Sequence, residues 1–205
     1  MSTATRRLMK EYSILKKKPV DNIIARPSTN VHKWYFMLHS LDGDYKDGLY
    51  IGKIVFPSNY PFSPPDVIFL TPNGRFETNK KICLSFTSYH PESWNPSWNM
   101  SNMLIGLISF MYENTATTGG LNTSGSAKRR YARRSIAFNL SVPEFKDLFL
   151  DDIMRLKIDL DKASENNSAE LRVTKGLGEA ILDRKATIFA FLILIIAIYI
   201  GFSFT

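Results

Sequence analysis

Cysteine, histidine and C-terminal charge are all scarce in this 205-residue sequence, which has one cysteine and three histidines. A single cysteine excludes an internal disulfide framework and a zinc site built from several thiolates. The lone thiol also suits a reducing compartment. Because the histidines are scattered as well, we expect no metal site. Ordinary shares of apolar residues, 44%, and of charged residues, 22%, exclude a wholly disordered or fibrous chain.

Positive charge is concentrated in the first two thirds of the chain. Residues 1–142 hold 18 basic and 9 acidic residues, whereas residues 143–185 hold 8 and 10. A basic body suits either nucleic acid or an acidic protein partner. Five of the seven residues from Lys128 to Arg134 are basic, but no aromatic stacking motif accompanies them. We therefore expect an acidic protein partner and no nucleic-acid binding.

No charged residue follows Lys185, and this final segment is strongly apolar. Between Thr187 and Phe204, twelve of eighteen residues are Ile, Leu or Phe. A helix of that length spans roughly 27 Å, which matches a thin bilayer of the endoplasmic reticulum (ER) type. The sequence therefore predicts a transmembrane tail anchor at residues 186–205. A buried core helix is the alternative, against which the missing polar face argues.

The flanks of this segment predict the side of the membrane on which the rest of the chain lies. The N-terminal sequence MSTATRRLMKEY has no apolar signal-peptide core. Arg184 and Lys185 directly precede the apolar run, and basic flanking residues favour the cytosolic side. We expect residues 1–163 to form a cytosolic domain, residues 164–185 a polar linker and residues 186–205 the anchor in the ER membrane.

The periodicity of apolar residues before the linker predicts an α+β domain. Helical spacing predicts an N-terminal helix at Thr5–Leu15 and a central helix at Ser101–Tyr112. We expect a short basic helix at Lys128–Ile136 and another helix after the capping-box sequence Ser141–Glu144. Period-two alternation between the first two helices predicts four strands joined as an antiparallel meander. These strands are Asn22–Ala25, Lys33–His39, Leu49–Phe56 and Val67–Leu70.

Three short motifs occur after the third predicted strand in a fixed order. Residues 56–65 read FPSNYPFSPP, residues 82–84 read ICL, and residues 94–98 read WNPSW. Over about residues 5–160 the chain resembles ubiquitin-conjugating enzymes, in which an FPxxYPFxPP stretch, an active-cysteine loop and a W-x-P segment come in this order. The resemblance implies the fold of that family, with an N-terminal helix, a four-stranded antiparallel meander, a central helix and C-terminal helices.

Two further segments resemble class J of that family. Residues 71–76 read TPNGRF and residues 89–94 read YHPESW, as in the members that a C-terminal span anchors to the ER and that serve ER-associated degradation. Most other members carry a His-Pro-Asn triplet before the cysteine. Here Thr71-Pro72-Asn73 takes its place, and ten positions rather than the usual eight separate Asn73 from Cys83.

The resemblance implies that Cys83 is the nucleophile of two acyl transfers. Ubiquitin comes from the activating enzyme, which consumes the ATP, and stays on Cys83 as a thioester until an acceptor amine or hydroxyl attacks. We therefore expect no cofactor to be bound to this chain. A cysteine with an ordinary pKa near 8.5 is roughly 3% ionised at pH 7, and Lys80 and Lys81 are expected to raise that fraction modestly if they lie nearby. A buried, inert thiol is the alternative.

Two residues near Cys83 in the sequence are candidates for supporting roles, and each has a second interpretation. By resemblance, Asn73 either stabilises the oxyanion or supports the active-site loop, for instance through a turn with Gly74. His90 is a weaker candidate for the general base that activates the acceptor, because histidine titrates near neutral pH. For His90 we favour a purely structural role in its loop.

The resemblance also assigns partner surfaces. Phe62 and Pro96 match the loop positions where the RING domains of ubiquitin ligases dock, and loop packing is the alternative. Arg6, Arg7 and Lys10 match the helix face that meets the activating enzyme, and an ordinary solvated face is the alternative. The implied partners are ubiquitin, the ubiquitin-activating enzyme, a RING-type ligase and the ER membrane.

The sequence thus predicts a tail-anchored ubiquitin-conjugating enzyme that passes ubiquitin, with a ligase, to lysine or hydroxyl acceptors in ER-associated degradation. One alternative is a non-catalytic membrane adaptor that binds ubiquitin or ligases, against which the presence of Cys83 argues. The other is a conjugating enzyme of the same fold that carries a different ubiquitin-like modifier. A charging assay with several modifiers distinguishes these three functions.

Overall fold

The computed structural model describes residues 1–168 and residue 185. The chain divides into two units, Met1–Ile153 and Met154–Thr205, and all elements discussed below belong to the first. In the second unit, residues 154–168 are helical, which extends regular structure into the predicted linker. The predicted anchor at residues 186–205 lies outside the described residues. None of the described helices is both long enough and apolar enough to cross a membrane.

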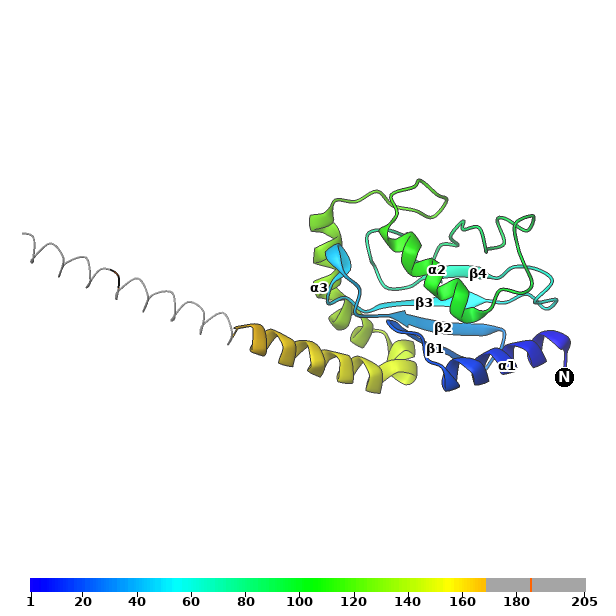
Figure 1. Ribbon diagram of the computed structural model, residues 1–205, viewed down its shortest axis with the longest axis horizontal. Coiled ribbons are helices and arrows are strands. Elements are labelled where there is room, and N and C mark those ends of the chain that lie inside the picture. The colour runs from blue at the N-terminus through cyan, green and yellow to red at the C-terminus, as the bar shows by residue number, and fades with distance from the viewer. Residues whose placement is uncertain (169–184, 186–205) are drawn as a thin grey trace, which may run out of the picture. The chain divides into compact units, whose positions relative to one another are not determined.

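The first unit is built on a four-stranded antiparallel sheet whose spatial order is the order in the sequence (Figure 1). The strands are β1 (Ile23–Pro27), β2 (Lys33–Leu38), β3 (Tyr50–Val55) and β4 (Asp66–Phe69). A short 3-10 helix, η1 (Gly43–Tyr45), lies between β2 and β3. The predicted meander is confirmed, and every strand boundary lies within two residues of the expected one.

Two of the predicted helices are also confirmed. They are α1 (Thr3–Lys17) and α2 (Met100–Tyr112). The Ser2 side chain accepts the Thr5 N–H at the start of α1, and the Asn99 side chain accepts the Asn102 N–H at the start of α2. Each cap satisfies a backbone donor that has no partner within its own helix.

The predicted short basic helix is longer than expected. Helix α3 runs from Gly125 to Ser141, and its inward face carries Ala132, Ser135 and Asn139. Ser135 Oγ accepts the Leu49 N–H, and the Asn139 side-chain amide donates to the Leu49 carbonyl. The inward face of α3 is thus held by hydrogen bonds to Leu49, directly before β3. Because these contacts are polar, the periodicity of apolar residues did not predict the full length of the helix.

The main hydrophobic core includes one face of the sheet and the inward sides of α1 and α2. Alternate residues of β2, namely Trp34, Phe36 and Leu38, belong to this core, as period-two alternation predicts. Gly52 on β3 leaves room for the Phe36 ring, since a Cβ there would lie 2.2 Å from Phe36 Cζ. Helix α2 contributes Met100, Met103, Leu104, Leu107 and Met111.

The opposite face of the sheet is covered by helical residues 143–153. Arg26 on β1 donates from Nη1 to the Leu148 carbonyl at 2.7 Å, and its Nη2 pairs with Asp152 at 2.6 Å. The Tyr35 hydroxyl on β2 donates to Glu144. The buried apolar residues that lie outside the main core include Tyr35, Met37, Leu49, Ile51, Phe145, Phe149 and Ile153.

The capping box predicted at Ser141–Glu144 is not formed, although the next helical segment begins at residue 143 as expected. The Ser141 hydroxyl donates backward to the Phe138 carbonyl at 2.7 Å instead of capping the new helix. Glu144 bonds to Tyr35 on the sheet. The two side chains that the local pattern assigned to the cap thus bond elsewhere, Ser141 within α3 and Glu144 to the sheet.

Candidate active site

Cys83 lies in an irregular segment whose backbone is held on both sides. The preceding residue, Ile82, donates its N–H to Val67 on β4 at 3.0 Å. The Cys83 N–H donates to the Thr118 carbonyl at 3.0 Å, and the Thr117 hydroxyl donates to the Cys83 carbonyl. The thiol is half-buried rather than enclosed in the core. A fixed backbone with a partly accessible sulfur is the arrangement that a nucleophile exchanging acyl groups with large partners requires.

The thiol lines a cleft of about 750 Å³. Its two walls come from the segment that follows Cys83 and from the segment that follows α2. Between them the cleft offers a thiol, an imidazole, a carboxylate and several hydroxyl groups. The lining residues are Arg75, Cys83, Leu84, Ser85, His90, Glu92, Ser93, Phe110, Thr115, Ala116, Thr117 and Thr118.

His90 contacts the thiol directly. Its Nε2 lies 3.1 Å from Cys83 Sγ, and its Nδ1 lies 2.8 Å from Glu92 Oε1. The hydrogen bond with His90 lowers the pKa of the Glu92 carboxyl group. The three side chains thus form a line of nucleophile, imidazole and carboxylate, in which the carboxylate orients the ring. His90 also accepts the Ser93 N–H on its carbonyl, so it supports its loop as well.

The two lysines before Cys83 are directed to carboxylates and do not line the cleft. Lys80 Nζ pairs with Glu77 at 2.7 Å, and Lys81 Nζ pairs with Asp66 at 2.7 Å. The hydrogen bond that Lys81 donates to Asp66 raises the pKa of Lys81. Because each positive charge is already paired and exposed, we expect little of the thiol activation that their position in the sequence suggested.

Asn73 is fully buried and uses its side chain within its own turn. Its Oδ1 accepts the N–H groups of Arg75 and Phe76, both at 2.8 Å. Its Nδ2 donates to the Thr71 carbonyl at 3.1 Å. Asn73 is not among the residues that line the Cys83 cleft. Of its two interpretations, loop support is the one that these bonds favour.

Arg75 also lines the cleft, although no sequence pattern indicated it. Only 3% of the residue is exposed, and no ion pair of the described residues involves it. Its Nε donates to the Phe110 carbonyl at 3.1 Å, and its Nη2 donates to the Thr115 carbonyl at 2.8 Å. Arg75 therefore fixes the end of α2 and the start of the wall that holds the Cys83 backbone.

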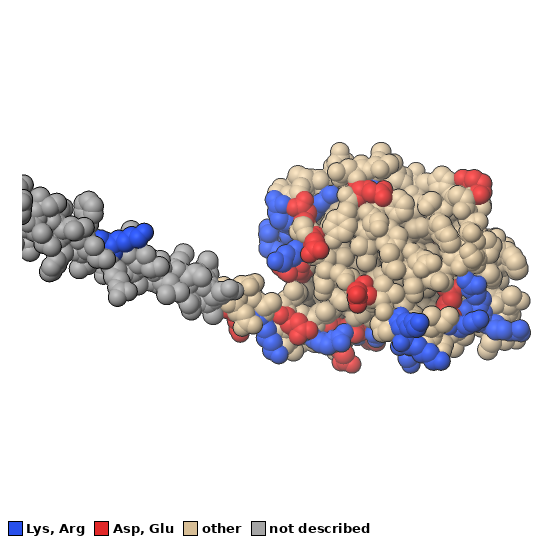
Figure 2. Space-filling view, in the orientation of Figure 1, with Lys and Arg blue, Asp and Glu red and all other residues tan. Residues whose placement is uncertain are grey.

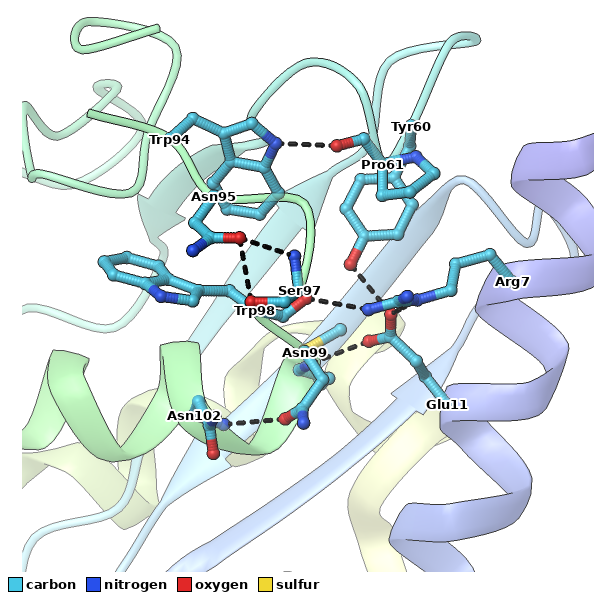
Figure 3. Close-up of polar contacts among 11 residues, drawn as sticks. Arg7, Glu11, Tyr60, Pro61, Trp94, Asn95, Ser97, Trp98, Asn99 and Asn102 are labelled. Atoms are coloured by element: carbon cyan, nitrogen blue, oxygen red, sulfur yellow. Dashed lines mark hydrogen bonds and ion pairs between the residues drawn. The ribbon is translucent and has the colours of Figure 1, made fainter. Parts of the chain in front are cut away.

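The two predicted ligase-docking positions are exposed on loops that contact each other. Phe62 is 72% exposed, and Pro96 is also exposed. Trp94 Nε1 donates to the Pro61 carbonyl at 2.7 Å, which ties the second loop to the first (Figure 3). The Tyr60 and Trp94 rings also pack together, with centroids 6.1 Å apart. The structure thus brings the loops of Phe62 and Pro96 into one region.

The three basic residues assigned to the activating-enzyme face differ in environment. Arg6 and Lys10 are exposed, and Figure 2 shows Lys and Arg side chains gathered over α1 and over α3. Arg7 is partly buried, and it pairs with Glu11 and donates to the Trp98 carbonyl at 2.9 Å. Arg7 therefore makes internal contacts that the other two residues do not make. Sequence patterns gave no sign of the buried Glu11.

Several known proteins are similar in sequence to most of this domain. The chain is 50% identical over 146 residues to probable ubiquitin-conjugating enzyme E2 33 of Arabidopsis thaliana, a match that covers 70% of this chain and 60% of that protein. It is 44% identical over 164 residues to ubiquitin-conjugating enzyme E2 6 of Schizosaccharomyces pombe, covering 78% and 72%. It is 42% identical over 158 residues to ubiquitin-conjugating enzyme E2 J2 of Homo sapiens, covering 76% and 61%.

The chain thus matches 60% and 61% of the length of the plant and human relatives. The match to the family itself extends over residues 7–144, which include most of α1, the sheet, α2, α3 and the Cys83 cleft. This agreement over more than half of the sequence settles the classification, and the chain belongs to the ubiquitin-conjugating enzyme family.

Proposed function

We propose that the protein accepts ubiquitin from the activating enzyme on Cys83 and transfers it, together with a RING ligase, to amine or hydroxyl acceptors. The observation that carries the proposal is the half-buried Cys83 thiol, fixed through its backbone at the edge of a cleft and in contact with His90. The activating enzyme consumes the ATP, so the proposal needs no cofactor bound to this chain.

The two transfers proposed for Cys83 balance without a further reactant. The thiolate attacks the thioester carbonyl of ubiquitin on the activating enzyme, a new C–S bond forms, and the thiolate of that enzyme leaves. An acceptor nitrogen or oxygen then attacks the new thioester and loses its proton to a base. Cys83 leaves as the thiolate, ready for the next cycle.

We assign the role of that base to His90. Glu92 faces Nδ1, which favours the tautomer that carries its proton on Nδ1 and leaves Nε2 as an acceptor. Nε2 lies 3.1 Å from the sulfur that becomes the thioester, and a thioester has no S–H to donate, so Nε2 is available to take the proton of the acceptor. The sequence alone favoured a structural role for His90, because the loop that connects it to Cys83 gave no sign of contact between them.

The charging reaction is tested with the full chain in detergent micelles, activating enzyme, ATP and ubiquitin, on reducing and non-reducing gels. The wild type should form an adduct that reductant removes, Cys83→Ser a more stable ester, and Cys83→Ala no adduct. Parallel reactions with other ubiquitin-like modifiers test the alternative specificity. A wild-type protein that is not charged with any modifier supports the adaptor function and refutes the proposal.

The proposed base is tested with His90→Gln, with His32→Gln in the turn before β2 as the matched control. Charging should survive in both variants, because an attacking thiolate needs no base. Single-turnover discharge to a free amine or hydroxyl should slow by about 100-fold or more in His90→Gln only, which is a typical contribution of general-base catalysis. Equal discharge rates in the two variants would leave His90 with a structural role alone.

We also propose the class J assignment, with residues 1–163 as a cytosolic catalytic domain, residues 164–185 as a linker and residues 186–205 as an ER tail anchor. The support is the uncharged apolar run after Lys185 together with the TPNGRF and YHPESW segments. Tethering raises the effective concentration of the enzyme at ligases and substrates on the same membrane. The proposed biological role is ER-associated degradation.

Deletion of residues 186–205 tests the anchor. Charging in solution should be unchanged, because the deletion leaves the described domain intact. In cells the truncated protein should move to the cytosolic fraction, and ER membrane clients should become longer-lived in a turnover chase. Truncated protein that still sediments with ER membranes, or that clears membrane clients at the full-length rate, would contradict this part of the proposal.

A further inference from the structure

Glu11 is a buried carboxylate on α1 at which three segments of the chain meet (Figure 3). Its side chain is 4% exposed. Its Oε1 lies 2.5 Å from Arg7 Nε and accepts the Tyr60 hydroxyl at 2.8 Å, while its Oε2 accepts the Met100 N–H at 2.7 Å. A charge this deeply buried is tolerated only with such a set of donors, so all the partners are held to one arrangement.

The donors come from segments that are far apart in the sequence. Arg7 belongs to α1, Tyr60 to the proline-rich segment after β3, and Met100 to the first turn of α2. Met100 carries one of the backbone N–H groups that a helix start leaves without an internal partner, and a negative charge is favoured at that end. One carboxylate thus fixes α1, the segment around Tyr60 and the start of α2 to each other.

The same segments lead directly into the two proposed ligase-docking positions. Tyr60 lies two residues before the exposed Phe62, and Met100 lies four residues after the exposed Pro96. Arg7, while paired with Glu11, also donates to the Trp98 carbonyl at 2.9 Å and so holds the second loop from the other side. The carboxylate therefore bonds to the base of both loops without touching the solvent-facing surface.

We propose that Glu11 is a positioning residue that sets the spacing between Phe62 and Pro96, and thereby the response of the enzyme to a RING ligase. This inference rests on the proposed function. Glu11 contacts neither the thiol nor the ligase surface, and it acts through Tyr60, Arg7 and the start of α2. Glu11→Gln keeps the shape of the side chain but removes its charge and places an amide donor opposite groups that are themselves donors.

A matched control is available on the opposite face of the sheet. Glu144 also accepts a tyrosine hydroxyl and pairs with a cation, through Tyr35 and Lys33, yet it lies far from both loops in the sequence. Glu144→Gln therefore removes a carboxylate with similar partners and serves as the control for the loss of a negative charge. Because Glu144 is 54% exposed and Glu11 only 4%, the loss of stability is measured separately, as the melting temperature of each variant. Tyr60→Phe, which removes one donor to Glu11 and keeps its charge, is the milder second variant should Glu11→Gln fail to fold.

The loop positions are measured by fluorine NMR on the full chain in detergent micelles, labelled with 5-fluorotryptophan. The sequence holds three tryptophans, Trp34, Trp94 and Trp98, and each is assigned by its replacement with phenylalanine. In Glu11→Gln the signals of Trp94 and Trp98 should shift or broaden, while that of Trp34 on β2 stays in place. Glu144→Gln should leave the signals of Trp94 and Trp98 unchanged.

The functional readout is discharge with the RING domain that stimulates the wild type most among a panel of recombinant RING domains. In Glu11→Gln the stimulated rate should fall about tenfold, the order of loss seen when a docking anchor is displaced. Charging and ligase-free discharge should stay at wild-type rates, and all three rates should stay there in Glu144→Gln.

The outcomes separate this inference from the proposed function. A wild-type chain that does not charge refutes the proposed function, while the NMR shifts still report whether Glu11 sets the loops. A charged Glu11→Gln with a full ligase response overturns the inference, whatever its NMR signals do. Losses of all three rates in Glu11→Gln in proportion to its loss of melting temperature would show that Glu11 contributes stability alone and would also overturn it.

Discussion

Replacing Asn73 by alanine separates the two roles that the sequence left open for this residue. The amide makes three buried hydrogen bonds within its own turn, to Thr71, Arg75 and Phe76. Alanine removes all three and leaves two backbone N–H groups and one carbonyl without their partners. We therefore expect Asn73→Ala to act mainly on stability.

The size of this effect follows from the number of bonds. A net contribution of about 1 kcal/mol for each bond gives a loss of about 3 kcal/mol in the free energy of unfolding. For a domain of this size each kcal/mol lowers the melting temperature by about 2–4 °C, so a decrease of about 6–12 °C is expected. Charging and discharge, measured below the melting temperature, should change by similar factors.

The assay combines thermal unfolding with single-turnover charging and discharge, and Asn95→Ala is the matched control. Asn95 forms a turn of the same kind, in which Oδ1 accepts the Ser97 N–H at 2.9 Å, but it is exposed. The control should lower the melting temperature far less than Asn73→Ala. A normal melting temperature together with a selective loss of discharge of about 100-fold or more would refute loop support and establish the oxyanion role.

Two further predictions follow from the exposed side chains. Phe62→Ala should abolish RING-stimulated discharge while charging survives, because the ring is 72% exposed and makes the proposed apolar anchor; a normal response to the RING domain would contradict the assigned surface. The Tyr35 hydrogen bond lowers the pKa of Glu144 below its usual 4.5, so the carboxylate stabilises the fold above that pH and stops doing so as the pH falls through the lowered value. Glu144→Gln should thus cost less than about 1 kcal/mol at pH 7, since the side chain is 54% exposed, and progressively less as the pH falls through the lowered pKa; a loss that stays the same from pH 7 to acid pH in urea unfolding would contradict this reasoning.

Local patterns were sufficient to predict the strands and to select Cys83 as the candidate nucleophile. The alternation from Trp34 to Leu38 predicts a strand because successive side chains point to opposite faces, and the structure buries Trp34, Phe36 and Leu38 in one core. The Pro-rich segment, the ICL triplet and the WNPSW segment single out Cys83 because their order along the chain is a property of the sequence itself.

Polar packing limited what the periodicity of the sequence revealed about helices. Helix α3 extends beyond the predicted Lys128–Ile136 because its inward face carries Ser135 and Asn139, whose side chains bond to the backbone of Leu49. Hydrophobic periodicity detects a face that is buried by apolar contact. It does not detect a face that is buried by hydrogen bonds to the backbone of a distant residue, here Leu49 directly before β3.

The partners of the charged residues were decided by the tertiary structure alone. Lys80 and Lys81 flank the active-site loop in the sequence, yet they pair with Glu77 and Asp66 instead of facing the thiol. Conversely, Arg75 reaches the Cys83 cleft. Side chains adjacent in an irregular segment share no common direction, so the fold and not the spacing selects their partners.

The sequence by itself determined the family, the order of the elements and the choice of Cys83 as the candidate nucleophile, because these depend on local periodicity and contiguous motifs. The tertiary structure decided that His90 touches Cys83, that Asn73 serves its own turn, and that Glu11 bonds to Met100 across the domain. These contacts depend on where the packed core places the loops and helix ends. A buried polar group then bonds to whichever donor the fold brings near, since leaving it without a partner costs more than almost any local preference gains.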